Sequence, residues 1–367
     1  MTRTTPAEGI GKETTRSPRS LIGALIIALA VFLGLLVILE GLFRFTSLDR
    51  ILSLRSVGVY HAQFEIKWFE LKDYVRENGG VDVILMGNSM VNTGIDPAVL
   101  SAEYSSLTGE DLRIFNFGVE GLTVAPNSVI AKRLAERYHP GTILFVTEMR
   151  DYAINNGLEI EQTLLDNEWF TSDSATTWLK NNSTVLQHLL PYRNWSRADF
   201  LDNFLMSMRR FNDTTTQGYE PDSHTGVDID IPPDPSDPEE KEDFILFADY
   251  AVDPDRLKAL GDILSLEEQG MTVIVTEMPV HPNYFVYFGG EQAHAPYLDQ
   301  LVPFITSRGG SFLPAIAWQL IPLEDRVDHH HLNYKGATRF SKLLAEELAD
   351  LCQRSGDCLR SAPGGSQ

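Results

Sequence analysis

Short runs of apolar residues alternate with longer amphipathic stretches along most of this chain of 367 residues. The apolar runs are rich in β-branched residues and end at turn-forming residues, which is typical of buried strands. One amphipathic stretch starts with Asp96 as a cap and Pro97 at the first helical position. We expect strands at residues 81–86, 112–117, 142–147, 271–277 and 311–316, and helices at residues 64–76, 97–107, 127–138, 255–268, 294–308 and 335–352.

This order of elements predicts the α/β fold class, with a parallel sheet of about five strands covered by helices on both faces. Binding sites of such sheets lie beyond the carboxyl ends of the strands. Ser89 follows the first expected strand, Arg150 the third and His281 the fourth. We therefore expect these three residues to converge at one edge of the sheet.

An uninterrupted apolar run at residues 21–39 precedes the alternating part. A helix of that length rises by roughly 28 Å, which matches the hydrocarbon thickness of a bilayer. The run lacks the small residues that precede signal cleavage, so a retained transmembrane helix at residues 20–43 is preferred over a cleaved signal peptide. Lys12, Arg16 and Arg19 lie before the run. They predict a single-pass protein of the cell membrane, with the N-terminus in the cytoplasm and the catalytic domain outside it.

The rest of the chain divides by composition. Residues 152–253 interrupt the alternation as an insertion that contains Trp169, Trp178 and Trp195. These side chains either stack on sugar rings or pack inside a cap subdomain. An acidic, proline-rich loop at residues 219–243 is expected to be mobile. The expected units are a disordered cytoplasmic tail (1–19), the transmembrane helix (20–43), a connector (44–80), the catalytic domain (81–350) and a C-terminal tail (351–367).

The net charge of −21 disfavours nucleic acid and anionic lipid surfaces as partners, because their phosphates would repel the chain, and we expect no nucleic acid. Part of the charge is local, with ten carboxylates and one lysine between Glu220 and Asp243. The two cysteines, Cys352 and Cys358, have no histidine beside them, which argues against zinc. They either form a small disulfide loop or are incidental thiols, and the sequence leaves both possibilities open.

Two motifs at opposite ends of the chain carry candidate chemistry. Ser89 stands at the end of the first strand, and Asp328 precedes His331 by three residues. His331 is a candidate base for a serine nucleophile, and Asp328 can orient the imidazole. The alternatives are a serine that only caps a helix, and a metal site at the histidines near Asp325 and Asp328. Because neighbouring side chains of an extended loop point apart, we expect no metal, and we expect no cofactor.

Acyl transfer also requires donors for the developing oxyanion. Gly118 and Gly121 follow the second strand and offer backbone amides. Arg150 is a candidate for binding an oxyanion or an anionic substrate group, and a structural ion pair with Asp151 is its alternative. His281 and Asn333 are candidates for lining the cleft.

These motifs together resemble the SGNH (GDSL-like) hydrolases. The first block of that family, Gly-Asp-Ser, is similar to Gly87-Asn88-Ser89, and its second block is similar to Asn116 through Gly121. The resemblance implies a flavodoxin-like three-layer α/β/α sandwich and assigns Ser89, His331 and Asp328 as catalytic. It adds Asn88 to the substrate region and makes Gly121 an oxyanion donor. The third block, Gly-x-Asn-Asp, is replaced by Glu148-Met149-Arg150-Asp151, so that Arg150 stands near the place of the asparagine.

Within this superfamily the chain resembles the membrane-anchored proteins of polysaccharide O-acetylation and teichoic-acid D-alanylation. That resemblance implies a serine acyl esterase or O-acyltransferase that acts on a cell-surface polysaccharide through an acyl-serine. It also implies an acylated glycan or polymer as substrate and a polytopic membrane acyltransferase as partner. The alternative is a non-catalytic accessory or binding protein of such an acyltransferase system, which the missing asparagine favours.

Overall fold

A computed structural model describes residues 18–45, 54–154, 159–238, 241–247 and 249–362. Its centre is a five-stranded parallel sheet in the order β2-β1-β3-β4-β5. The predicted α/β class and all five expected strands are confirmed. The last strand ends earlier than expected because Pro314 follows it, and proline cannot donate a hydrogen bond to a ladder. The strands are β1 (Val83–Gly87), β2 (Ile114–Gly118), β3 (Thr142–Thr147), β4 (Thr272–Glu277) and β5 (Ser311–Leu313).

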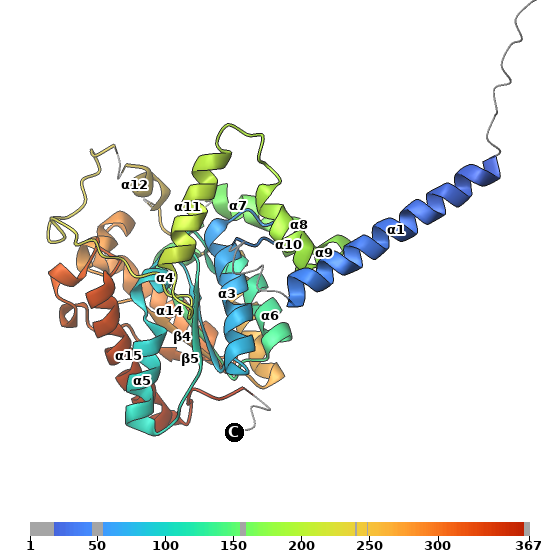
Figure 1. Cartoon of the computed structure of the whole chain (residues 1–367). Coiled ribbons are helices and arrows are strands. Elements are labelled where there is room, and N and C mark those ends of the chain that lie inside the picture. Colours follow the sequence, from blue (N-terminus) through green and yellow to red (C-terminus); the bar gives the residue numbers. More distant parts are fainter. Residues whose placement is uncertain (1–17, 46–53, 155–158, 239–240, 248, 363–367) are drawn as a thin grey trace, which may run out of the picture.

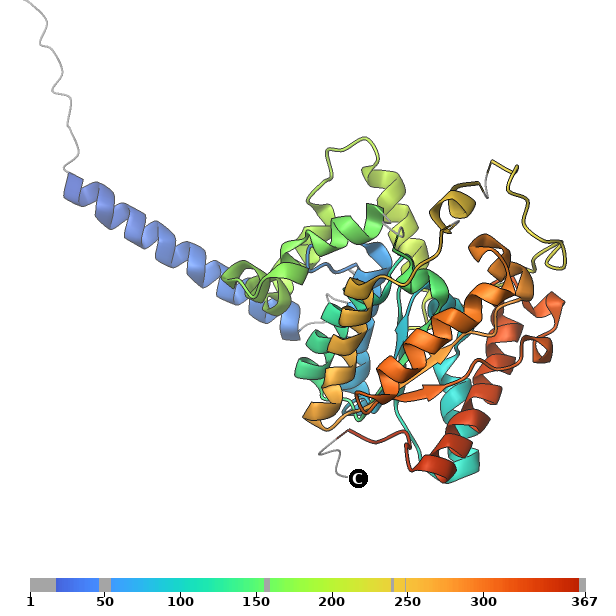
Figure 2. The same cartoon turned by 180° about the vertical axis from the view of Figure 1, so that it is seen from behind.

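Helices cover both faces of the sheet and make three layers (Figures 1 and 2). Strand side chains such as Val83 and Leu85 pack with the helices of one face, and the alternate residues Ile84 and Met86 pack with those of the other. Both faces are apolar, as expected for a parallel sheet buried on both sides. One face carries α4 (Ser89–Gly94), α5 (Pro97–Thr108) and α15 (Tyr334–Ser355), and the other carries α3 (Ala62–Asn78), α6 (Val124–Tyr138), α13 (Pro254–Leu264) and α14 (His294–Thr306).

The strand register brings the carboxyl ends of β1 to β4 to a common edge. Gly87 at the end of β1 lies opposite Gly118 at the end of β2, and Thr147 of β3 lies opposite Glu277 of β4. Several 3₁₀ helices follow at or near this edge. They are η1 (Met149–Tyr152), η4 (Pro282–Phe288), η5 (Glu291–Ala293), η6 (Trp318–Leu320) and η7 (Leu323–Asp325). A further 3₁₀ helix, η3 (Ser265–Gln269), extends α13 and precedes β4.

The insertion is mainly helical in the parts that the structure describes. Trp169 is fully buried against Phe64 and Trp68, so the packing interpretation holds for this residue. Trp178 and Trp195 remain 65% and 74% exposed, so neither packs inside a cap. The helices of the insertion are α7 (Glu159–Leu165), α8 (Glu168–Thr171), α9 (Ala175–Asn182), α10 (Thr184–Leu189), η2 (Leu190–Tyr192), α11 (Phe200–Asp213) and α12 (Lys241–Phe247).

The first part of the acidic loop contacts the domain, while its expected mobility stays a prediction. The Glu220 carboxylate accepts hydrogen bonds from Gln63 Nε2 at 2.7 Å and Asn92 Nδ2 at 3.0 Å. Further along, the Gly226 amide donates to the Arg326 carbonyl at 2.8 Å. These partners belong to α3, to α4 and to the segment before His331, so this part of the loop crosses the catalytic edge of the sheet.

The N-terminal helix α1 (Pro18–Phe45) projects away from the sheet domain (Figures 1 and 2). Among the described residues, its segment Ile22–Arg44 is the one stretch of helix long and apolar enough to cross a membrane. Only its domain-side end touches the rest of the structure, where it contacts α10. The expected disordered tail at residues 1–19 lies almost wholly outside the described residues, as does part of the connector.

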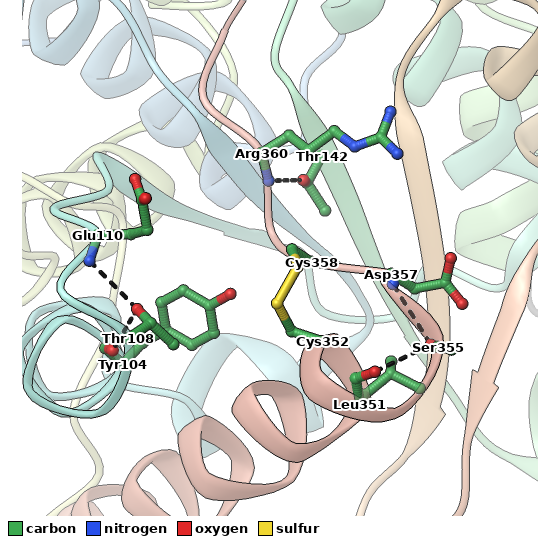
Figure 3. Close-up of a disulfide and its surroundings, with 10 residues drawn as sticks. All are labelled: Tyr104, Thr108, Glu110, Thr142, Leu351, Cys352, Ser355, Asp357, Cys358 and Arg360. Atoms are coloured by element: carbon green, nitrogen blue, oxygen red, sulfur yellow. Dashed lines mark hydrogen bonds between the residues drawn. A yellow bond between two sulfur atoms is a disulfide. The ribbon is translucent and has the colours of Figure 1, made fainter.

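The C-terminal end of the chain is fastened at two points. Cys352 at the end of α15 and Cys358 in the tail form a disulfide (Figure 3), which decides between the two possibilities left open by the sequence. Beyond it, the Arg360 amide donates to Thr142 Oγ1 at the start of β3 at 2.8 Å. The tail therefore closes over the amino end of the sheet, opposite the catalytic edge.

Candidate active site

Ser89 occupies a sharp turn between β1 and α4. Gly87 before it has φ 151°, and a Cβ atom there would lie 2.5 Å from both the Val146 carbonyl oxygen and the Val91 side chain. Only glycine fits that approach. The helix cap is Asn88, whose side-chain oxygen accepts from the Met90 amide at 2.9 Å. Since Asn88 fills the capping role, the interpretation of Ser89 as a mere cap is wrong.

The two sequence motifs meet in space. Ser89 Oγ lies 2.8 Å from His331 Nε2, and His331 Nδ1 lies 2.7 Å from Asp328 Oδ2. Asp328 Oδ1 also accepts from the backbone amides of His330 and His331, at 2.8 and 2.7 Å. With Asp328 accepting from Nδ1–H, the imidazole presents an unprotonated Nε2 to the serine hydroxyl, which is the arrangement of a general base.

Electrostatics favour this division of roles. Burial alone would lower the pKa of His331, but the carboxylate of Asp328 and its hydrogen bond raise that pKa above its ordinary value. Burial likewise opposes ionisation of Asp328, yet the adjacent histidines and the hydrogen bonds hold its pKa well below the usual range. Asp328 therefore stays ionised and stabilises the imidazolium that forms when His331 takes the serine proton.

The loop histidines are closer together than the sequence argument allowed. The rings of His330 and His331 have centroids 4.0 Å apart, and His330 Nδ1 lies 3.2 Å from Asp328 Oδ1. The expectation that adjacent side chains point apart is thus wrong, and these three residues offer ligand atoms within 4.8 Å of one another. However, both ring nitrogens of His331 are engaged by Ser89 and Asp328, so a metal held by all three would have to displace a triad contact. Burial lowers the pKa of His330 to about 3, so its ring is neutral.

A buried network that the sequence did not predict supports the nucleophile turn. Asn88 Nδ2 donates to Glu148 Oε1 at 2.6 Å and to Asp151 Oδ1 at 3.3 Å. The Tyr284 hydroxyl donates to the other Glu148 oxygen, and Thr147 Oγ1 donates to Asp151 at 3.0 Å. Burial, and then the neighbouring Glu148, raise the pKa of Asp151 well above normal, and burial also raises that of Glu148. A neutral amide thus separates two buried acids that repel each other.

The expected oxyanion donors separate into two groups. Gly121 has a left-handed φ of 73° and lines the pocket together with Ser89 and Arg150. Arg150 pairs with Asp243 of the insertion, its Nη2 lying 3.8 Å from Oδ1. Gly118 does not reach the pocket, because its amide donates to Asn116 Oδ1 at 2.9 Å and its α-carbon faces the backbone of α4. The prediction for Gly118 is therefore wrong.

His281 and Asn333 also lie outside the pocket, and both are positioning residues. The His281 ring packs edge-on against Trp318 at 4.7 Å, and its amide donates to the His329 carbonyl at 2.8 Å. Asn333 caps α15 through its side-chain oxygen, and its Nδ2 donates to the Glu324 carbonyl at 2.9 Å. These contacts fix the loop that carries Asp328 and His331, so the predicted cleft-lining role of the two residues is wrong.

The pocket itself has a volume of about 580 Å³ and extends well beyond the triad. His61 comes from the connector and lies 3.1 Å through Nε2 from the Glu120 carbonyl. Arg210 comes from α11 and donates to the Glu120 carboxylate at 2.7 Å. Tyr60, beside His61, has the Arg193 guanidinium over its ring at 4.0 Å. No local sequence signal marks these residues, because they meet only through tertiary contacts.

Fold and site together define a parallel α/β/α protein with a hydrogen-bonded serine, histidine and aspartate at the carboxyl edge of its sheet. No protein-family model matches the sequence, and no curated protein matches it. Solved structures show distant similarity. A candidate acylhydrolase from Bacteroides fragilis is 10% identical, with 78% of this chain and 99% of the other covered and a TM-score of 0.36. A candidate platelet activating factor from Streptococcus pneumonia is 11% identical, with 77% and 91% covered and a TM-score of 0.37. An acetyl xylan esterase from Butyrivibrio proteoclasticus is 11% identical, with 76% and 65% covered and a TM-score of 0.28.

Likenesses at these identities and TM-scores carry no functional argument.

Proposed function

We propose that this chain is a serine-dependent acyl esterase or O-acyltransferase that works through an acyl-serine intermediate. The observation that carries the proposal is the continuous hydrogen-bonded relay from Ser89 through His331 to Asp328, at 2.8 and 2.7 Å. A partly buried carboxylate, an oriented imidazole and a hydroxyl in this order activate a nucleophile. The relay also opens into the main pocket, which both Ser89 and His331 line.

In the first half-reaction, Ser89 Oγ attacks the carbonyl carbon of the acyl ester as His331 Nε2 takes its proton. The tetrahedral intermediate collapses, the bond to the alcohol breaks, and His331 returns the proton to the leaving oxygen. The acyl group is then bound to Ser89. In the second half-reaction, His331 takes a proton from water in an esterase or from a sugar hydroxyl in a transferase, as that oxygen bonds to the acyl carbon. The bond between the acyl carbon and Ser89 Oγ then breaks, and His331 returns the proton to Ser89.

We expect three groups to stabilise the oxyanion. Ser89 is the first residue of α4, where a backbone amide has no partner within its helix. Gly121 presents its backbone to the same pocket, and Arg150 supplies a positive charge. Charged and backbone donors fixed in a low-dielectric pocket are the largest source of rate enhancement in acyl transfer.

Several features support an extracytoplasmic enzyme held by α1. Glu40 and Arg44 near the end of the helix make hydrogen bonds with the insertion, so removal of the helix would leave those partners unsatisfied. The Cys352–Cys358 disulfide is stable in oxidising compartments. We assign the N-terminus to the cytoplasm and the domain to the outer side.

A cell-surface polysaccharide is the substrate class that suits the pocket. Its walls offer polar partners for sugar hydroxyls from Glu120 and Arg210, and the ring of Tyr60 offers a flat apolar face. The pocket is broad enough for more than an acyl group. A polytopic membrane acyltransferase that supplies the acyl group is the partner we propose for the transferase reaction.

One observation favours a second candidate, a non-catalytic accessory protein of an acyltransferase system. Arg150 stands near the place where the resembling family has an oxyanion asparagine, and it pairs with Asp243. In an accessory protein the same pocket would bind the polymer without forming an acyl-serine. The two candidates differ in whether Ser89 reacts.

The test uses the full chain in detergent, a fluorophosphonate probe and p-nitrophenyl acetate. Ser89→Ala should lose both labelling and turnover. The control is Ser265→Ala, which changes an exposed serine remote from the pocket and should behave as the parent. Equal labelling of the parent and Ser89→Ala, or no labelling of the parent, would reject the acyl-serine and favour the accessory protein.

A further inference from the structure

Exposed apolar side chains gather on a helical hairpin of the insertion that the catalytic proposal does not use. The hairpin consists of α9 (Ala175–Asn182) and α10 (Thr184–Leu189). Trp178, Leu179 and Leu189 are 65%, 48% and 58% exposed. None of the three lines the active-site pocket. Large exposed aromatic and aliphatic side chains on adjoining helices indicate a surface that binds a membrane or another protein.

The hairpin is joined directly to the end of the membrane-spanning segment. Glu40 Oε1 accepts from the Thr184 amide at 2.8 Å, and Glu40 Oε2 accepts from Ser183 Oγ at 3.0 Å and the Val185 amide at 3.2 Å. One carboxylate thus accepts the hydrogen bonds of the first backbone amides of α10. These are charge-assisted hydrogen bonds, which are shorter and stronger than neutral ones.

Two further contacts fix the angle between the helix and the hairpin. Arg44 Nη2 donates to the Asn182 carbonyl at the end of α9 at 2.8 Å. The rings of Phe43 and His188 have centroids 5.1 Å apart. Because the contacts span residues 40 to 44 of one helix, α1 is fixed to the hairpin over more than one turn rather than at a single point.

The position of the hairpin along the membrane normal follows from these contacts. The apolar run ends at Leu39, and Glu40 is the first charged residue after it. Glu40 therefore lies at the boundary between hydrocarbon and headgroups, and so do the residues hydrogen-bonded to it. Both views show α9 and α10 beside the domain-side end of α1 (Figures 1 and 2). Tryptophan is enriched at this depth, where an amphipathic ring is most stable.

We propose that the α9–α10 hairpin is a second membrane contact, in which Trp178 and Leu179 enter the interfacial layer of the lipid bilayer beside α1. Together with α1 it holds the domain in one orientation, so that the pocket has a defined height above the membrane. The inference depends on α1 spanning the membrane and not on the acyl-serine chemistry. The occupant is the lipid surface, and a partner protein is the competing occupant.

The test measures contact between tryptophan and lipid. The full chain is reconstituted into phosphatidylcholine vesicles with or without bromine atoms on the acyl chains, which quench tryptophan by contact. We expect quenching of the parent, and a roughly twofold or greater decrease of that quenching in Trp178→Phe, because Trp178 is the tryptophan at interface depth. The matched control is Trp318→Phe, since Trp318 packs on His281 beside the triad loop and should not reach lipid.

Two results would overturn the proposal. One is equal quenching of the parent and Trp178→Phe, which would leave the surface free for a partner protein. The other is loss of quenching in Trp195→Phe alone, which would assign the contact to Trp195, outside the hairpin.

A second measurement needs no variant and covers the case in which Trp178→Phe fails to fold. Amide hydrogen exchange of residues 175–189 in the parent should be several-fold slower in phosphatidylcholine nanodiscs than in a lipid-free amphipathic polymer. Equal exchange in the two carriers would contradict a lipid contact. Glu40→Gln should reduce this protection, because an amide side chain caps α10 less strongly than a carboxylate.

Discussion

The buried network behind the nucleophile gives the sharpest test of the site. Asn88 is the neutral donor between the carboxyl groups of Glu148 and Asp151, at 2.6 and 3.3 Å. The change Asn88→Asp keeps the shape of the side chain and replaces this donor by a third acid. Three carboxyl groups would then share one buried site, and the hydrogen bonds that Asn88 donates would be lost.

The new side chain of Asn88→Asp can either stay ionised or bind a proton, and the loss of stability is set by whichever costs less free energy. Two like charges about 4 Å apart repel by about 4 kcal/mol at an effective dielectric constant of about 20, and burial adds a cost of desolvation to the new carboxylate. The alternative is to bind a proton, which costs about 1.4 kcal/mol for each pH unit above the ordinary pKa of about 4. At pH 7 the second route costs about 4 kcal/mol, so we expect the free energy of unfolding to fall by about 3–4 kcal/mol.

The pH dependence has a definite sign. The acids of the variant have pKa values that are raised in the folded state, so they bind more protons when folded than when unfolded. Their penalty is small below the unfolded pKa of about 4 and grows as the pH rises towards the folded value. Urea unfolding of the full chain in detergent, followed by tryptophan fluorescence at pH 5 and pH 7.5, should therefore show a much larger loss at the higher pH.

The matched control is the double variant Asn88→Asp with Glu148→Gln. It contains the same number of buried carboxyl groups as the parent and again pairs an amide with an acid, so most of the lost stability should return. The reasoning is refuted if Asn88→Asp is as stable as the parent at pH 7.5. It is also refuted if the double variant is no more stable than Asn88→Asp.

Two further predictions concern the relay and the C-terminus. Since the carboxylate of Asp328 raises the pKa of His331, kcat/KM should decline on the acid side with a midpoint above the ordinary histidine pKa of about 6.5. Asp328→Asn should move that midpoint to lower pH and reduce kcat by about 10⁴-fold. An unchanged midpoint would assign the titration to another group. Cys352→Ser should lower the free energy of unfolding by about 2 kcal/mol, because the disulfide no longer closes a short loop in the unfolded chain. Activity at low urea should be unchanged. The same urea midpoint for variant and parent would show that hydrogen bonds alone hold the tail.

The sheet was predictable because both of its faces are buried, and parallel strands of that kind are continuous apolar runs in the sequence. All five runs became strands, and only their ends moved. The first run was expected to begin at residue 81, but β1 begins at Val83. Before it, the Asp82 amide donates to the Arg113 carbonyl and the Asp82 side chain forms an ion pair with the guanidinium of Arg113. These contacts join the segments just before β1 and β2, ahead of the first ladder hydrogen bonds, and no periodicity of the sequence reveals them.

The order of strands predicted the positions of some site residues correctly and the position of His281 wrongly. The rule that sites lie beyond the carboxyl ends placed Ser89 and Arg150 correctly in one pocket. The same rule failed for His281, because Pro282 begins a 3₁₀ helix immediately after it and the ring turns onto Trp318. The order of elements gives the edge of the sheet at which a residue emerges. It does not give the direction in which the next turn carries the side chain.

The pocket walls were beyond sequence reasoning for a different reason. His61 of the connector and Arg210 of the insertion both bind Glu120, which follows β2. Their separations along the chain are 59 and 90 residues, so neither periodicity nor a local motif can pair them. Contacts of this kind depend on how the connector and the insertion fold over the sheet edge.

The two departures from the pattern that the chain resembles are easier to understand together than separately. Asn88 stands where that pattern has an aspartate, and Glu148 stands where it has a glycine, so each alone suggests a weakened site. In the structure the Asn88 amide donates to the Glu148 carboxylate at 2.6 Å. Glu148 thus provides a carboxyl group beside residue 88, where the pattern has a carboxyl group on residue 88 itself. A buried acid is costly unless it is partnered, and Asn88 and Tyr284 are the partners of this one. The double variant Asn88→Asp with Glu148→Gln returns the acid to residue 88, and its stability tests whether the two positions are interchangeable.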